Sequence, residues 1–337
     1  MFRVRLCVVV LVFGCSESRE VKVQRFLLKG NAMAEKLNYE QAEAYYKEAI
    51  KLDTCFADAW NNIGTIQFKK QEFVKAADSY SKAIQCRPDF IIAYLNRSNS
   101  YYESGELFTA LADVEKAIEI KPDTAVAYFT KGLILTKLRR YNNAETSFRK
   151  SRSINPEDRE SLINLGVLKY YLNEYDSAEI ILNKALIIKS DEPIIYNTLS
   201  LIACSKQKFS EALVWIEKAL KIAPKDSYFI NNRGYIHLMN GNLSAALEDI
   251  DNSIIRDPNN AWAYRNKGIY YYEMKNFPSA LRLLKRAETM DASAPYVNKY
   301  LGLTYLAMDD FDTACSHFKK AIEAGETIEQ NFLKDCQ

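Results

Sequence analysis

The sequence predicts an all-α protein built as an array of nine 34-residue helix-turn-helix repeats spanning residues 23–328. Three series of small residues indicate this array, and none of them is broken by an insertion or deletion. The first series is Ala42, Ala76, Ala110, Ala144, Ala178, Ala212, Ala246, Ala280 and Ala314. The second is Gly30, Gly64, Ser98, Gly132, Gly166, Ser200, Gly234, Gly268 and Gly302, and the third runs from Ala49 to Ala321 with the same spacing. Self-similarity at a fixed period is typical of stacked supersecondary units and not of a single globular core.

Each repeat contains two helical patterns, described here by positions counted from Val23 as position 1. The small residue at position 8 lies midway along the first pattern. The alanines at positions 20 and 27 are seven residues apart, which places them on one face of the second. Small side chains on these faces allow the two helices to pack closely. Larger residues at position 24 should then form a hydrophobic spine: Tyr46, Tyr80, Val114, Phe148, Leu182, Ile216, Ile250, Leu284 and Phe318.

Turn and stop signals separate the two patterns. Gly105, Asn173 and Gly241 share position 15, where we expect the turn between the helices. Proline ends the second helix at position 32, in Pro88, Pro122, Pro156, Pro224 and Pro258. Most repeats carry Lys or Arg at position 26, which we expect near the end of the second helix, where the helix dipole favours a cation.

These features resemble a known repeat family. The pattern of Trp60, Ile63, Gly64, Ala76, Tyr80, Ala83 and Pro88 resembles a tetratricopeptide repeat. The resemblance covers residues 23–328 and implies a right-handed α-solenoid, a superhelix whose first helices line a concave groove. Asn298 replaces the large residue that other repeats carry at position 4, so the last repeat is atypical. We interpret residues 329–337 as a C-terminal capping segment.

The N-terminus has the pattern of an export signal. Arg3 and Arg5 precede an apolar run from Leu6 to Phe13, which is too short for the roughly 20 residues of a membrane-spanning helix. A basic start, a short apolar stretch and a small residue predict a signal peptide over residues 1–14.

The end of this segment also resembles a bacterial lipobox, in the run Val12-Phe13-Gly14-Cys15. The resemblance implies lipid on Cys15, a lipidated linker over 15–22, and a bacterial TPR lipoprotein at the outer membrane facing the periplasm. An ordinary signal peptide or an uncleaved leader remain as alternatives.

Catalytic signals are absent from the sequence. Arg3 and Arg5 of the leader account for the formal net charge of +2. The rest of the chain is therefore near neutral and offers no electrostatic support for nucleic-acid binding. His237 takes a position where other repeats place core residues. We interpret five cysteines without metal or redox spacing as small, semi-buried residues: Cys55, Cys86, Cys204, Cys315 and Cys336. We therefore expect no enzyme, no cofactor and no metal.

Polar and aromatic residues recur where the resemblance places the groove. Position 6 holds the amide column, which we define as Asn62, Asn96, Asn164, Asn232 and Asn266. Asn is only a fair helix former, so helix propensity does not explain its repetition. A carboxamide both donates and accepts hydrogen bonds, as binding to an extended peptide requires. The alternative is that these amides tie adjacent repeats together.

Aromatic residues recur near the C-terminus. Position 2 holds the aromatic column of Tyr228, Trp262 and Tyr296, and Arg265 lies at position 5. Aromatic and arginine side chains are common binding anchors. Packing between repeats is again the alternative.

Together these features predict a non-enzymatic scaffold or adaptor, anchored to the bacterial envelope, that binds an extended peptide or a partner protein. No nucleic acid is expected, and the sequence carries no indication of oligomeric state. The alternative function is a glycan- or peptidoglycan-associated adaptor of envelope enzymes, whose aromatic column would stack on sugars.

Overall fold

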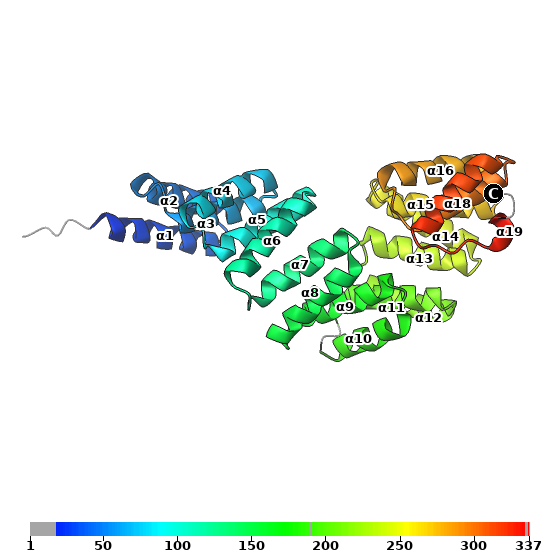
Figure 1. Ribbon diagram of the computed structural model, residues 1–337, viewed down its shortest axis with the longest axis horizontal. Helices are drawn as coiled ribbons and strands as arrows, with labels where there is room; N and C mark the ends of the chain where they lie inside the picture. Colours follow the sequence, from blue (N-terminus) through cyan, green and yellow to red (C-terminus); the bar gives the residue numbers. More distant parts are fainter. Residues whose placement is uncertain (1–17, 189–190, 334–335, 337) are drawn as a thin grey trace, which may run out of the picture. The chain divides into compact units, whose positions relative to one another are not determined.

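A computed structural model describes residues 18–188, 191–333 and 336, and all regular secondary structure within these residues is helical. The chain divides into two compact units, residues 1–161 and 162–337, which are described separately. In both, the helices follow one another as helix-turn-helix pairs (Figure 1). The all-α solenoid predicted from the period is therefore confirmed.

The first unit contains four helix pairs in its described residues. Their bounds are α1 Arg19–Glu35, α2 Tyr39–Leu52, α3 Ala57–Lys69, α4 Phe73–Cys86, α5 Ile91–Ser104, α6 Leu107–Ile120, α7 Ala125–Lys137 and α8 Tyr141–Ile154. Helix α9, Arg159–Tyr171, begins at the end of this unit and continues into the second.

The second unit continues the pattern with α10 Tyr175–Ile188, α11 Pro193–Ser205, α12 Phe209–Ile222, α13 Ser227–Met239, α14 Leu243–Arg256, α15 Ala261–Glu273, α16 Phe277–Met290, α17 Val297–Leu306, α18 Phe311–Glu323 and α19 Gln330–Leu333. Helix α17 starts two residues later in its repeat than α15 does. Tyr296, immediately before it, has a left-handed backbone with φ of 65°.

The small residue at position 8 is required by the spine residue at position 24 of the same repeat. A Cβ atom on Gly132 would lie 2.5 Å from a ring carbon of Phe148, and one on Gly64 would lie 2.7 Å from the Tyr80 ring. Where position 8 is Ser98, the spine residue is the smaller Val114, and both side chains are fully buried. The predicted spine is confirmed, since all nine of its side chains are at most 2% exposed.

The turn between paired helices is left-handed at position 15 in every repeat. Gly105 and Gly241 have φ of 86° and 77°, and Asn173 has φ of 58°. Leu37, Gln71, Arg139, Gln207, Lys275 and Asp309 adopt the same conformation without being glycine. The prediction from Gly and Asn is confirmed, and the structure extends it to residue types that carry no turn signal.

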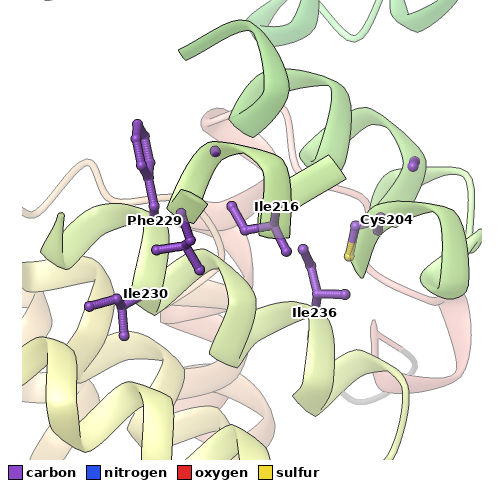
Figure 2. Close-up of a cluster of buried hydrophobic side chains, with 9 residues drawn as sticks. Cys204, Ile216, Phe229, Ile230 and Ile236 are labelled. Atoms are coloured by element: carbon purple, nitrogen blue, oxygen red, sulfur yellow. The ribbon is translucent and has the colours of Figure 1, made fainter. Parts of the chain in front are cut away.

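The hydrophobic core is shared between neighbouring helices. Figure 2 shows one cluster in the second unit, where Cys204 of α11, Ile216 of α12 and Ile236 of α13 come together. Cys204 is buried and unpaired, and burial raises the pKa of its thiol to about 12. This thiol stays protonated and behaves as a small apolar side chain.

Two disulfides correct the interpretation of the other cysteines. Cys55 is bonded to Cys86, with Cα atoms 5.1 Å apart, and Cys315 is bonded to Cys336 at 5.2 Å. The first joins the loop before α3 to the last residue of α4. The second holds the C-terminal segment against α18, where Phe332 of α19 also stacks on Phe318 at 6.4 Å.

The ends of the array are defined by local capping. Helix α1 begins four residues before the first predicted repeat, because the Ser18 side chain caps it by accepting from the Val21 N–H. Cys15 and the predicted signal peptide lie outside the described residues. None of the described helices is long and apolar enough to cross a membrane.

Candidate partner-binding surface

The amide column forms hydrogen bonds between neighbouring repeats. In the first unit, Asn96 Nδ2 donates to Asn61 Oδ1 at 3.0 Å, and Asn62 Nδ2 donates to Asn31 Oδ1 at the same distance. In both cases a position-6 amide reaches a carboxamide of the preceding repeat.

The second unit repeats this arrangement. Asn232 Nδ2 donates to Asn197 Oδ1 at 2.8 Å, and Asn266 Nδ2 donates to Asn231 Oδ1 at 2.9 Å. The acceptors Asn197 and Asn231 are at position 5 of their repeats, like Asn61, and all three are nearly buried. These partners were not predicted from the sequence, although it contains the Asn61-Asn62 and Asn231-Asn232 doublets.

The members of the column differ in exposure. Asn62, Asn96, Asn164 and Asn232 are half-buried. Asn266 is fully buried, so its amide lies inside the packing between repeats and not on a surface that a ligand reaches. The surface available to a partner therefore carries four of the five predicted amides.

Arg265 is also placed inside the structure, with 3% of its side chain exposed. Its guanidinium donates to Asn266 Oδ1 at 2.7 and 2.9 Å and to the Pro295 carbonyl at 3.1 Å. It also lies over the rings of Tyr235, at 5.3 Å, and Trp262, at 4.8 Å. Burial lowers the pKa of this guanidinium. These contacts make Arg265 a link between α15 and the irregular start of α17.

The aromatic column is partly exposed. Tyr228 is 53% exposed and Tyr296 is 40% exposed, whereas Trp262 is half-buried beside Arg265. The Tyr296 backbone N–H donates to Glu326 of the C-terminal segment. Tyr228 and Tyr296 can therefore meet a partner, and Trp262 offers it only part of its surface.

The cations at position 26 make contacts that the sequence did not indicate. Lys82 lies before the last turn of α4, and its Nζ is 4.3 Å from the ring centre of Trp60. Lys218 and Arg286 lie 4.0 Å from the rings of Trp215 and Tyr264. In these three repeats, contact between the cation and an aromatic ring explains the position better than the helix dipole does. Lys320 lies in the last turn of α18, where the helix dipole favours it.

The described residues contain no group of three or more His, Cys, Asp or Glu side chains that could hold a metal ion. Of the two histidines, His317 is nearly buried. Its Nδ1 lies 2.9 Å from Asn298 Oδ1, and its ring stacks on Tyr305. Burial lowers the pKa of this imidazole, which favours its neutral form.

Comparison with solved structures identifies the same architecture in other proteins. A chain of an APC/C hetero-tetramer is 17% identical over 94% of this chain and 63% of its own length, with a TM-score of 0.62. PilW, a type IV pilus biogenesis factor, is 19% identical over 60% of this chain and 94% of its own, with a TM-score of 0.54. Pseudomonas aeruginosa pilF is 15% identical over 66% and 98%, with a TM-score of 0.53. At these identities the likeness concerns the fold alone.

No curated protein matches the sequence. Sequence profiles described as tetratricopeptide repeat match residues 24–54, 57–90, 91–124, 125–158, 215–248 and 265–327. An array of such repeats is a scaffold suited to protein–protein interaction. Together with the helix pairs and the 34-residue period, these matches show that the chain belongs to the tetratricopeptide repeat family.

Proposed function

We propose that the protein is a non-enzymatic scaffold that binds an extended peptide or a partner protein along the half-buried amides of its first helices. The observation that carries this proposal is the orientation of Asn62, Asn96 and Asn232 by bonds to the preceding repeat. Each such bond uses one of the two N–H groups of a carboxamide. The side chain is thereby fixed, and it retains capacity to bond the peptide groups of a partner.

Fixed side chains favour binding because less conformational entropy is lost when the partner arrives. Within each unit, amides on neighbouring first helices are held by the same kind of bond. A row of equally held amides favours recognition of a backbone over recognition of particular side chains. An extended segment with little sequence preference is the ligand that fits this arrangement.

The Asn61–Asn96 pair separates binding from structural support. Asn61→Ala and Asn96→Ala each remove the hydrogen bond between these two residues, and Asn61→Ala also removes the bond from Asn61 Nδ2 to Asn62 Oδ1 at 3.2 Å. Asn61 is 8% exposed, whereas Asn96 is half-buried. Asn96→Ala should lose about 1 kcal/mol of unfolding free energy, and Asn61→Ala about 1–2 kcal/mol because it removes two bonds. Asn96→Ala removes the amide itself and should weaken a bound peptide by about 0.5–1.5 kcal/mol. Asn61→Ala only releases that amide from its fixed orientation and should weaken the peptide less.

The ligand for this test is a peptide from a partner captured by in-cell crosslinking at position 96, and calorimetry measures its affinity. Equal affinity losses in the two variants would mean that the amides only hold repeats together.

We further propose that lipid on Cys15 anchors the protein to a bacterial envelope, with the repeats on the periplasmic side. The basic and apolar leader that ends in Cys15 supports this placement, and so do the two disulfides, because disulfides persist in oxidising compartments. Cys15→Ala should abolish labelling by radioactive palmitate and release the protein from membranes. Cys204→Ala is the matched control, because Cys204 is a free but buried cysteine. Membrane retention of the Cys15→Ala variant together with an unlabelled native chain would exclude the lipid anchor.

A glycan-binding adaptor is the second candidate, and the exposure of Tyr228 and Tyr296 favours it. In that case purified peptidoglycan should retain the protein, and Tyr228→Ala should reduce retention. Binding to a peptide array without retention on peptidoglycan would exclude it.

A further inference from the structure

A crevice of about 460 Å³ opens in the first unit between the second helices α2 and α4, with α3 beneath it. None of its lining residues belongs to the amide column. Its lining residues define what we call the lysine crevice: Glu43, Lys47, Ile50, Lys51, Trp60, Ile63, Gln67, Ser79 and Lys82.

The lysine crevice combines an apolar interior with cationic residues. Trp60, Ile50 and Ile63 provide the apolar surface, and Ile63 is 3% exposed. Lys47, Lys51 and Lys82 are exposed at its edges, and Glu43 is the one carboxylate in the lining. Glu43 bonds Lys47 at 2.7 Å and Lys70 at 3.6 Å, and Lys51 bonds Glu48, which lies outside the lining, at 2.5 Å. The lining therefore carries an excess of positive charge beside an indole ring.

The equivalent crevice in the second unit, between α12 and α14, lacks these features although its volume is similar, at about 520 Å³. Ile230 takes the place of Trp60, and Asn252 takes the place of Lys82. Its cations are Lys221 and Arg233, and Arg233 is bonded to Glu217 and Asp249.

The sequence extends this contrast to the other repeats. In the lysine crevice, Lys47 and Lys51 lie at positions 25 and 29 of one repeat, and Lys82 lies at position 26 of the next. No other pair of consecutive repeats has lysine at all three positions. The repeat fold itself does not require this combination, since the other repeats pack without it.

Local bonds hold the wall of the crevice in place. Trp60 Nε1 donates to the Thr54 carbonyl at 3.0 Å. The next residue, Cys55, is bonded to Cys86 at the end of α4. The disulfide therefore fixes the loop that orients the indole, and Lys82 covers the ring. A fixed aromatic wall is characteristic of binding pockets of this size.

We propose that the lysine crevice is a second binding site, which takes an acidic peptide segment carrying one large apolar side chain. The apolar side chain enters against Trp60, Ile50 and Ile63. Carboxylates on either side of it meet Lys82, Lys47 and Lys51. Charge complementarity selects this ligand, because the lining holds three ammonium groups and one carboxylate. Lys47 and Lys51 have ion pairs with Glu43 and Glu48 at the exposed edge, and Lys82 lies over the indole ring.

The experiment uses the full-length chain with its disulfides intact and a peptide probe, N-acetyl-Asp-Asp-Phe-Asp-Asp-amide. The protein has three tryptophans, Trp60, Trp215 and Trp262, so NMR of the indole N–H groups reports on each one separately. The probe should shift the Trp60 signal in a saturable manner and leave those of Trp215 and Trp262 unchanged. The same peptide with Ala for Phe, or with Lys for Asp, should bind at least about tenfold more weakly. A shift of the Trp262 signal alone would place binding on the first-helix surface and overturn the proposal.

Matched charge reversals test the lysines. Lys82 and Lys184 share position 26, both are exposed, and Lys184 has Leu162 where Lys82 has Trp60. Lys82→Glu should weaken the probe about thirtyfold, because an attraction of about 1 kcal/mol at contact becomes a repulsion of similar size, a change of about 2 kcal/mol. Lys184→Glu makes the same change in net charge and should alter affinity less than about twofold. Equal effects of the two substitutions, or no saturable binding up to about 1 mM probe, would refute this site. Neither result bears on the amide column.

Discussion

Adding one methyl group at Gly132 tests whether the spine residue dictates the small residue at position 8. A Cβ atom there would lie 2.5, 2.6 and 2.8 Å from Cε1, Cδ1 and Cζ of Phe148. Ordinary carbon contacts are near 3.5–4.0 Å, so the ring must move by about 1 Å. Phe148 is 1% exposed, and Phe129 packs against it at 5.9 Å, so the ring has little room.

Two opposing contributions set the change in unfolding free energy caused by Gly132→Ala. Overpacking of this kind costs about 1–3 kcal/mol. Replacing Gly by Ala inside a helix contributes about 1 kcal/mol of stability. Gly132→Ala should therefore lower the unfolding free energy by about 1 kcal/mol. The Ser98–Val114 pair shows that a side chain at position 8 is accepted when the spine residue is small.

The double variant makes the test specific. Phe148→Val alone should cost about 2–3 kcal/mol through the cavity it leaves. In that background Gly132→Ala should become stabilising by about 1 kcal/mol, which gives a coupling of about 2 kcal/mol between the two sites. Urea unfolding measures the free energies, and hydrogen exchange in α7 and α8 locates the effect. If Gly132→Ala changes the unfolding free energy in the same direction whether residue 148 is Phe or Val, the proposed clash is not what excludes a side chain at position 8.

Two further predictions concern backbone and charge. At position 15, Gly105→Gln should lower the unfolding free energy by about 1–2 kcal/mol, because φ is 86° there. Gln71→Gly, at φ of 62°, should raise it by about 0.5 kcal/mol. Urea unfolding of both variants checks this, and changes of the same sign would contradict it. His317 has its pKa lowered below 6.5 by burial, so the unfolded chain binds more protons and the stability of the last repeat should fall as the pH drops below about 6.5. Hydrogen exchange in α17 and α18 at pH 7 and pH 5 should show this loss, and the loss should be smaller in His317→Gln; an unchanged pH dependence in that variant would rule out the imidazole as its source.

The 34-residue period predicts those features of the fold that are the same in every repeat. The position-20 alanines are all 0% exposed because each lies where paired helices approach. The left-handed turn was predicted only where Gly or Asn marks it. Residues such as Leu37 and Gln71 adopt it because the helix pair imposes the geometry whatever the side chain.

Contacts that occur in only one repeat could not be predicted from the 34-residue period. Cys55 and Cys86 pair because a loop and a helix end meet in space, and their spacing of 31 residues matches no known motif. Arg265 was expected on the groove. It is buried because α17 begins at Val297, which leaves the Pro295 carbonyl free to accept from the guanidinium.

The amide column shows how one residue type can serve two purposes in a repeat array. A buried carboxamide that links two repeats must have a partner, since an unsatisfied polar group costs about 1–3 kcal/mol. In Asn266, the Nδ2 group donates to Asn231 and the Oδ1 atom accepts from Arg265. Asn96 has the same link to the preceding repeat but remains half-buried, so part of its amide still faces solvent. Recurrence at position 6 therefore follows from the need to join repeats, and the capacity to bind a partner depends on how far each amide is covered. For this reason the half-buried members, and not the column as a whole, are the residues at which binding has to be tested.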